Sequence, residues 1–154
     1  MNDLSLRESP PWLPLPLLFH RLSEGSRRKP RLVLIEDDPA IATMYRLQLV
    51  SDGFEVEIAR DGASGLHAVQ DSPPDLILLD VRLPRMNGLD LLESIVQDPR
   101  LAAVPVLILS NFGEADVISR GLELGARAYL IKSQTTPAEL SAKVREHLPT
   151  DSTD

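Results

Sequence analysis

Short, wholly apolar runs recur along this chain, and segments with helical periodicity lie between them. Residues 32–35 and 76–79 are the clearest runs, and residues 104–109 form a third that contains Pro105. Four or more consecutive apolar residues are typical of a strand that is covered on both faces. Strands of this kind that alternate with helices predict a parallel sheet with helices on both sides.

The full pattern predicts five strands and five helices. Besides the three runs, strands are expected at residues 54–59 and 128–131. Asp38 followed by Pro39 is typical of a helix N-terminus. This first helix should run to about Gly53, with four residues on its inner side: Ile41, Met44, Tyr45 and Leu49. Further helices are expected after Asp61, near residues 91–96, before Gly125 and up to residue 148. Five such repeats are too few for an eight-stranded barrel, so they predict an open, doubly wound, five-stranded α/β sheet.

The first 30 residues differ in composition from the rest of the chain. They contain five prolines and an excess of basic side chains, whereas residues 31–148 are acidic. Prolines at this density block both helix and sheet, so we expect residues 1–30 to be a disordered leader. The alternative is a docking segment in which Trp12 and nearby leucines bind a partner or the domain's own surface. Residues 149–154 are expected to be an acidic tail.

The composition excludes several classes of protein. The 154-residue chain has no cysteine, which excludes disulfides and thiolate chemistry and fits the reducing cytoplasm. There is no apolar run of about 18 residues, so no membrane span is expected. The formal net charge of -7 argues against direct binding to nucleic acid.

Polar and charged side chains stand where four of the predicted strands end. Glu36, Asp37 and Asp38 follow the first strand, and Asp80, Ser110 and Lys132 follow the third, fourth and fifth. In an open parallel sheet, ligands bind beyond the carboxyl ends of the strands. Clustered carboxylates repel unless a cation lies among them, and Mg²⁺ is the natural oxygen-seeking cation for such a site. Each residue alone also fits a turn, a cap or a solvated charge, and Asp38 fits a helix cap best.

Four segments of the chain resemble the receiver family of bacterial response regulators, in the family's order and spacing. They are residues 32–39, 74–88, 106–110 and 124–132, and the most specific is 74–88, Pro-Asp-Leu-Ile-Leu-Leu-Asp-Val-Arg-Leu-Pro-Arg-Met-Asn-Gly. The likeness is to stand-alone receivers of the chemotaxis-regulator kind. It implies the flavodoxin-like strand order 2-1-3-4-5.

The resemblance also implies a role for each strand-end residue. Asp80 would be the phosphoacceptor. Asp37 and Asp80 would bind Mg²⁺ directly, Glu36 would bind it through water, and the backbone carbonyl of Arg82 would complete the metal site. Ser110 and Lys132 would contact the phosphoryl oxygens. Tyr129 matches the family's aromatic switch position.

Three positions depart from the family pattern. Ser133 follows Lys132 where the family usually has proline, often in a cis bond, so the backbone there is expected to differ. Asn111 stands where the family usually has a small residue, and its side chain is expected to narrow access to Asp80. Arg82 is expected to reach over the site and alter the lifetime of the acyl phosphate.

The function implied is that of a phosphoacceptor in a two-component or phosphorelay system. A sensor histidine kinase or a histidine phosphotransfer protein would supply the phosphoryl group. The chain would not be an enzyme beyond assisting its own phosphorylation and dephosphorylation. Because the sequence ends soon after the last predicted helix, output is expected through contact with a downstream protein or through a relay. A homodimer is possible through the face of the fourth helix and fifth strand, which carries Arg120, Glu123 and Arg127.

Two other functions compete with this interpretation. A receiver-like interaction module that takes no phosphate would lack the acceptor, a metal acid or the lysine, and all are present. A phosphatase with an aspartyl nucleophile usually has a second acid two residues later, where this chain has Arg82.

Overall fold

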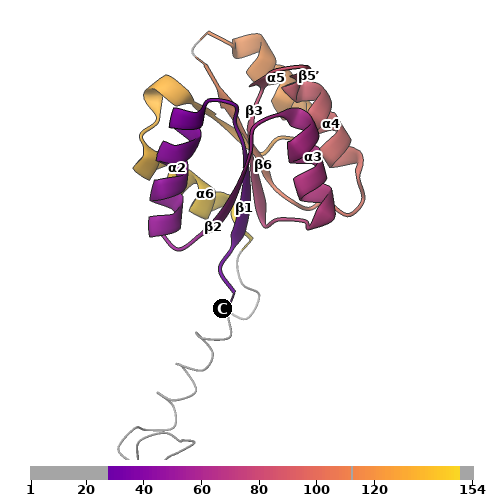
Figure 1. Cartoon of the computed structure of the whole chain (residues 1–154). Helices are drawn as coiled ribbons and strands as arrows, with labels where there is room; N and C mark the ends of the chain where they lie inside the picture. Colours follow the sequence, from indigo (N-terminus) through magenta and orange to yellow (C-terminus); the bar gives the residue numbers. More distant parts are fainter. Residues whose placement is uncertain (1–27, 112, 150–154) are drawn as a thin grey trace, which may run out of the picture.

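The computed structural model describes residues 28–111 and 113–149, and these form a parallel sheet between two layers of helices (Figure 1). The predicted leader, apart from residues 28–30, and the acidic tail, apart from residue 149, lie outside the described residues. None of the described helices is long and apolar enough to cross a membrane.

Strands and helices alternate as predicted. The strands of the main sheet are β1 (Arg31–Ile35), β2 (Glu55–Ala59), β3 (Leu76–Asp80), β6 (Val106–Ser110) and β7 (Ala128–Ile131). The helices are α2 (Pro39–Ser51), α3 (Gly62–Asp71), α4 (Gly88–Gln97), α5 (Ala115–Leu124) and α6 (Pro137–His147). The spatial order β2-β1-β3-β6-β7, with every pair parallel, confirms the predicted order 2-1-3-4-5.

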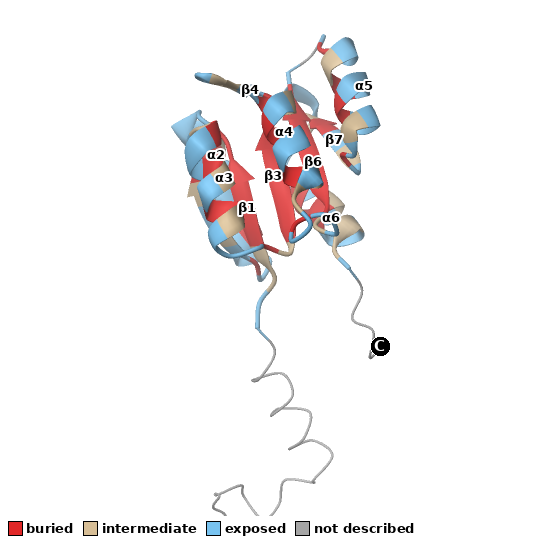
Figure 2. Ribbon diagram, turned by 90° about the vertical axis from the view of Figure 1, so that its right-hand side faces the viewer, coloured by how far each residue is buried: buried red, intermediate tan, exposed pale blue. Residues whose placement is uncertain are grey.

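Alternate residues of the apolar strands supply two separate cores. Val33, Ile35, Ile77 and Leu79 pack on the face covered by α3, α4 and α5. Leu32, Leu34, Leu76 and Leu78 pack on the opposite face, under α2 and α6. All of these side chains are fully buried, and Figure 2 shows the buried strands between partly exposed helices. Burial on both faces is why the strands read as continuous apolar runs.

Specific caps fix the helix boundaries. The Asp38 side chain accepts hydrogen bonds from the backbone N–H groups of Ala40 and Ile41, with Pro39 in the first turn, as the sequence predicted. Asp61 caps α3 through the N–H of Ser64. Gly125 ends α5 with a φ of 123°, a conformation that favours glycine.

Three details differ from the sequence prediction. Met44 is exposed, because α2 turns Ala42 toward the sheet together with the correctly predicted Tyr45 and Leu49. The strand formed by the third apolar run begins at Val106, because Pro105 has no N–H to donate, although the carbonyl of Pro105 accepts a hydrogen bond from the N–H of Ile77. A small hairpin of β4 (Arg82–Leu83) and β5 (Met86–Asn87), which the pattern did not predict, follows Asp80.

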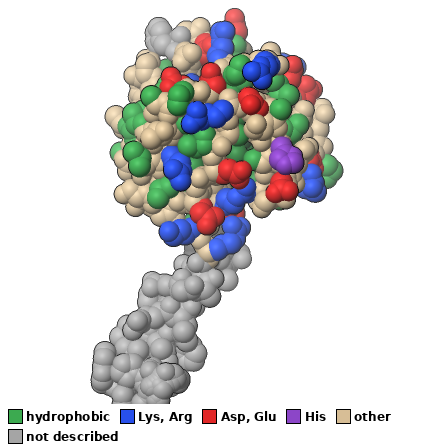
Figure 3. Space-filling model, in the orientation of Figure 1, with side chains coloured by type: hydrophobic (Ala, Val, Ile, Leu, Met, Phe, Trp, Pro, Cys, Tyr) green, Lys and Arg blue, Asp and Glu red, His purple; other side chains and the backbone are tan. Residues whose placement is uncertain are grey.

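Charged side chains are mixed on the surface. On the face drawn in Figure 3, basic and acidic side chains are interspersed with hydrophobic ones and do not gather into a basic patch. On that face, neither the mixed charges nor the acidic net charge favours binding of a nucleic-acid phosphate backbone.

Candidate functional site

The carboxyl ends of four parallel strands bring the predicted site residues to one edge of the sheet. Asp80 is the last residue of β3 and pairs in register with Leu109 of β6, so Ser110 lies one step further along. Ser110 in turn pairs with Ile131 of β7, the residue before Lys132. Glu36 directly follows Ile35, the last residue of β1, which pairs with Leu79 of β3. The parallel topology therefore assembles residues that are far apart in the sequence.

Lys132 lies between two buried carboxylates. Its Nζ is 3.0 Å from Oδ2 of Asp80 and 2.8 Å from Oε1 of Glu36. The contact with Asp80 is a hydrogen bond, whereas the approach to Glu36 is an ion pair outside hydrogen-bond angles. The side chains of Glu36, Asp80 and Lys132 are 0%, 2% and 10% exposed. One cation thus balances two buried anions, which leaves an excess of negative charge.

Backbone N–H groups hold the other oxygens of the two carboxylates. The N–H of Arg82 donates to Oδ1 of Asp80 at 2.9 Å, and the N–H of Asp38 donates to Oε2 of Glu36 at 3.1 Å. The loop after Asp80 is itself closed by Gly88, whose N–H donates to the carbonyl of Val81. A Cβ at Gly88 would overlap the Val81 backbone, so the close approach requires glycine.

Burial and the neighbouring charges shift the pKa values of Glu36 and Lys132. Burial raises the pKa of Glu36 to about 7, Lys132 opposes that rise, and the charge of Asp80 adds to it. Burial alone would lower the pKa of Lys132, but its contacts with Glu36 and Asp80 outweigh burial and raise it. A second cation near these acids would relieve the repulsion.

Glu36, Asp37 and Asp80 form an acidic cluster suited to such a cation. Each offers a carboxylate oxygen, and the three oxygens lie within 4.8 Å of one another. Asp37 is exposed, so the cluster opens to water on that side. An all-oxygen set with an open side fits a hard divalent cation that keeps part of its hydration shell.

Ser110 is fully buried and its hydroxyl has no hydrogen-bond partner among the described residues. Buried hydroxyls are normally satisfied, so an unpaired one at a strand end is a donor available to a ligand. Ser110 follows Leu109, the register partner of Asp80, so it lies at the same edge of the sheet as the Asp80 carboxylate.

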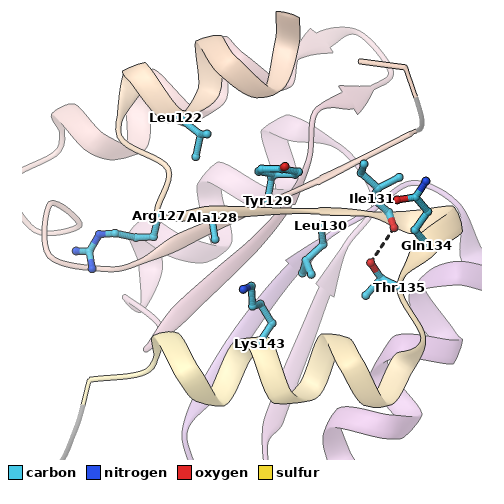
Figure 4. Close-up of a pocket in the computed structure, with 9 residues that line it drawn as sticks. All are labelled: Leu122, Arg127, Ala128, Tyr129, Leu130, Ile131, Gln134, Thr135 and Lys143. Atoms are coloured by element: carbon cyan, nitrogen blue, oxygen red, sulfur yellow. Dashed lines mark hydrogen bonds between the residues drawn. The ribbon is translucent and has the colours of Figure 1, made fainter. Parts of the chain in front are cut away.

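Tyr129 lies outside the acidic cluster. It belongs to β7 and is 44% exposed. In Figure 4 it stands on the same side of β7 as Leu122 of α5, above an open groove whose other border includes Lys143 of α6. The ring is therefore partly exposed at this groove and has no contact with the acidic cluster.

Arg82 makes a contact that the sequence did not predict. Its guanidinium pairs with Glu114, which precedes α5 and is buried. The second oxygen of Glu114 accepts a hydrogen bond from the backbone N–H of Asn111 at 2.8 Å. Glu114 was missed because acids near a helix start are common; its position four residues after Ser110 was the one available signal.

The backbone after Lys132 forms one turn of 3-10 helix, Lys132–Gln134, held by a hydrogen bond from the Thr135 hydroxyl to the carbonyl of Ile131. All peptide bonds in the described segments are trans.

Sequence comparison gives one family for most of the chain. The profile described as "Response regulator receiver domain" matches residues 32–145. The DNA-binding response regulator MtrA of Mycolicibacterium smegmatis is 37% identical over 118 residues, which are 77% of this chain and 50% of that protein. The phosphate regulon regulator PhoB of Rhizobium meliloti is 34% identical over 119 residues, or 77% and 52% of the two chains. The chain spans about half the length of these relatives.

Several solved structures have the same fold, and the match extends over more than nine tenths of each solved chain. The chemotaxis response regulator CheY4 of Vibrio cholerae matches with a TM-score of 0.72 at 25% identity, over 77% of this chain and 98% of that one. The Mn²⁺-bound form of response regulator Rcp1 matches with a TM-score of 0.68 at 28% identity, over 79% and 99%. The phosphorylated cyanobacterial phytochrome response regulator RcpA matches with 0.67 at 30% identity, over 78% and 91%.

Proposed function

The chain belongs to the response regulator receiver domain family, and on this premise we propose that it accepts a phosphoryl group on Asp80. The donor is a phosphohistidine of a sensor histidine kinase or of a histidine phosphotransfer protein. The observation that carries the proposal is the buried Asp80 carboxylate at a strand end, paired with Lys132 Nζ and beside Glu36 and Asp37, which follow β1. The phosphorylated form found for RcpA supports this chemistry in a similar fold.

Mg²⁺ is the proposed cofactor. Asp37 and Asp80 would bind it directly, Glu36 through water, and Arg82 through its backbone carbonyl. When bound, the ion supplies positive charge to the phosphoryl oxygens. The acidic cluster supports a cation here, as does the pKa of Glu36, which burial and, to a smaller extent, the charge of Asp80 raise. The similar protein Rcp1 binds Mn²⁺.

The protein's own groups have defined roles in the transfer. An oxygen of Asp80 attacks phosphorus, the phosphorus–nitrogen bond of the phosphohistidine breaks, and the imidazole nitrogen keeps the electron pair. Lys132 moves its ion pair from the carboxylate to a phosphoryl oxygen, and the unpaired Ser110 hydroxyl donates to another. Hydrolysis later returns Asp80 and inorganic phosphate. The domain thus assists its own modification and is a signalling module, with no separate substrate.

Intact-protein mass spectrometry tests this function. Incubated with acetyl phosphate and Mg²⁺, the protein should gain one phosphoryl group, whereas an excess of EDTA should prevent the gain. Asp37→Asn should need at least about tenfold more Mg²⁺ for half-maximal labelling, because it loses a charged ligand worth ~1.4 kcal/mol or more. Labelling of the parent that is independent of Mg²⁺ would contradict the metal assignment.

Exposed apolar side chains on α2 support the proposal that the phosphoryl donor is a protein. Met44, Leu47 and Val50 are exposed along this helix, which begins two residues after Asp37. An apolar helix face next to the acceptor suits a helical phosphohistidine protein that packs on α2 while its imidazole reaches Asp80. We place the encounter in the cytoplasm.

The output surface is proposed to be that of α5 and β7. Leu122 and Tyr129 are exposed there, as a contact with a downstream protein or with a second copy of the chain requires. MtrA is a DNA-binding response regulator and PhoB is a transcriptional regulatory protein, and this chain matches about half of the length of each. A module that takes no phosphate is the alternative, and the labelling experiment separates the two.

Phosphorylation should be read out through Ser110 and Tyr129. When the Ser110 hydroxyl moves to the phosphoryl group, the space it leaves lets the Tyr129 ring turn inward. Beryllofluoride, a stable phosphoryl mimic, should therefore shift the side-chain NMR signals of Tyr129. Ser110→Ala should keep the labelling of Asp80 but reduce that shift. The chain has two tyrosines, so Tyr45→Phe assigns the signals. An unchanged Tyr129 signal in the parent would remove the switch and leave the acceptor intact.

A further inference from the structure

Arg82 and Glu114 join the two loops that border the acceptor. Arg82 begins the β4 strand after Asp80, and Glu114 precedes α5 in the segment after Ser110. The Glu114 side chain is 6% exposed, whereas that of Arg82 is 65% exposed. A buried carboxylate thus holds a guanidinium that would otherwise be free to move in solvent.

Both oxygens of Glu114 are engaged. Oε2 pairs with Nε of Arg82, and Oε1 accepts the hydrogen bond from the N–H of Asn111. Burying a carboxylate is costly unless it is paired, and within the described segments Arg82 is its ion-pair partner. Breaking this pair would leave a buried carboxylate without a counter-charge, so the pair should be more stable than most ion pairs at a protein surface.

Arg82 also contacts the acceptor through its backbone. Its N–H donates to Oδ1 of Asp80, so the guanidinium is tethered within side-chain reach of any group attached to that carboxylate. A phosphoryl group on Asp80 would bring nearly two negative charges to this point. Glu114 and the phosphoryl group would then compete for the same cation.

We propose that Glu114 is a positioning residue that holds the Arg82 guanidinium away from the phosphoryl group and thereby shortens the lifetime of phosphorylated Asp80. This inference rests on the proposed function. In hydrolysis, water attacks phosphorus, the bond from phosphorus to the Asp80 oxygen breaks, and phosphate leaves as the carboxylate is restored. A guanidinium released from Glu114 pairs with the phosphoryl oxygens and covers the face that water approaches.

The test is a double-mutant cycle on the rate of phosphoryl loss. Glu114→Gln keeps the shape of the side chain and an acceptor for the Asn111 N–H but removes the charge that holds Arg82. Labelled with acetyl phosphate and freed of donor, this variant should lose its phosphoryl group about fivefold more slowly than the parent, the effect of a charge pair worth ~1 kcal/mol. It should also bind beryllofluoride more tightly.

The Arg82→Ala background separates positioning from a general change in structure. There, Glu114→Gln should alter the rate of phosphoryl loss by less than about twofold, since no guanidinium remains to be released. Asp116→Asn, which removes an exposed carboxylate from the first turn of the same helix, is the matched control and should behave as the parent. Thermal melts of each variant verify that it is folded.

The possible outcomes separate the two proposals. An unchanged or faster rate in Glu114→Gln, or the same slowing in the Arg82→Ala background, overturns the positioning role but leaves Asp80 as the acceptor. A parent protein that takes up neither a phosphoryl group nor beryllofluoride overturns both proposals.

Discussion

Replacing Lys132 by alanine is expected to destabilise the metal-free protein by about 3 kcal/mol at pH 8, because two buried carboxylates lose their shared cation. Lys132 Nζ is within 3.0 Å of both Glu36 and Asp80, and neither carboxylate is more than 2% exposed. Removing one partner of a buried ion pair leaves an uncompensated charge, which costs far more than the pair contributes on balance. Urea unfolding in EDTA measures the loss.

The loss should depend on pH, and the direction follows from Glu36. Burial raises its pKa to about 7 in the folded protein, against 4.5 as the ordinary value. A carboxyl group whose pKa is raised by folding stabilises the folded state at pH values below its ordinary pKa. That stability is lost as the pH rises through the pKa of the folded protein. Without Lys132 the pKa of Glu36 rises further, so the variant should be closest to the parent near pH 5 and furthest from it near pH 8. Added Mg²⁺ should narrow the gap by supplying another cation.

Two variants control this prediction. Lys132→Arg keeps the charge and should retain most of the stability. Lys143→Ala removes a lysine that lies 3.8 Å from Glu146 at the surface, and it should change the free energy of unfolding by less than about 0.5 kcal/mol. Equal unfolding midpoints for Lys132→Ala and Lys143→Ala in EDTA would show that the buried carboxylates do not depend on Lys132.

The strand ends could be predicted from the sequence because their signal is local. A run such as residues 76–79 identifies a strand, and the residue that follows it, Asp80, must lie at the carboxyl edge. Parallel pairing then brings Asp80, Ser110 and Lys132 together without further information. The same logic placed Glu36 beside them, and Pro39 after Asp38 located the start of α2.

Features that depend on side-chain packing were not predictable in this way. The helical pattern of α2 correctly placed Tyr45 and Leu49 on the inner face, but it put Met44 there in place of Ala42, because the exact rotation of the helix depends on its fit against the sheet and α6. The Arg82–Glu114 pair joins two loops whose relative position follows from the assembled fold. The orientation of the Lys132 side chain toward two acids and the unpaired hydroxyl of Ser110 likewise depend on side-chain positions that the sequence pattern does not determine.

Asp80→Asn is expected to abolish phosphorylation completely while preserving the fold. Asparagine has nearly the same shape, and its carbonyl oxygen can still accept the hydrogen bond from the Arg82 N–H. The amide is no nucleophile for phosphorus, so no acyl phosphate can form. The metal-free variant should be at least as stable as the parent, because one of the two buried negative charges beside Lys132 is gone.

The most direct measurement is the intact mass of the parent and of Asp80→Asn after the same incubation with acetyl phosphate and Mg²⁺. The account predicts one added phosphoryl group on the parent, located at Asp80 by peptide mapping, and none on the variant. Equal labelling of the two proteins, or a phosphoryl group mapped to another residue of the parent, would contradict it.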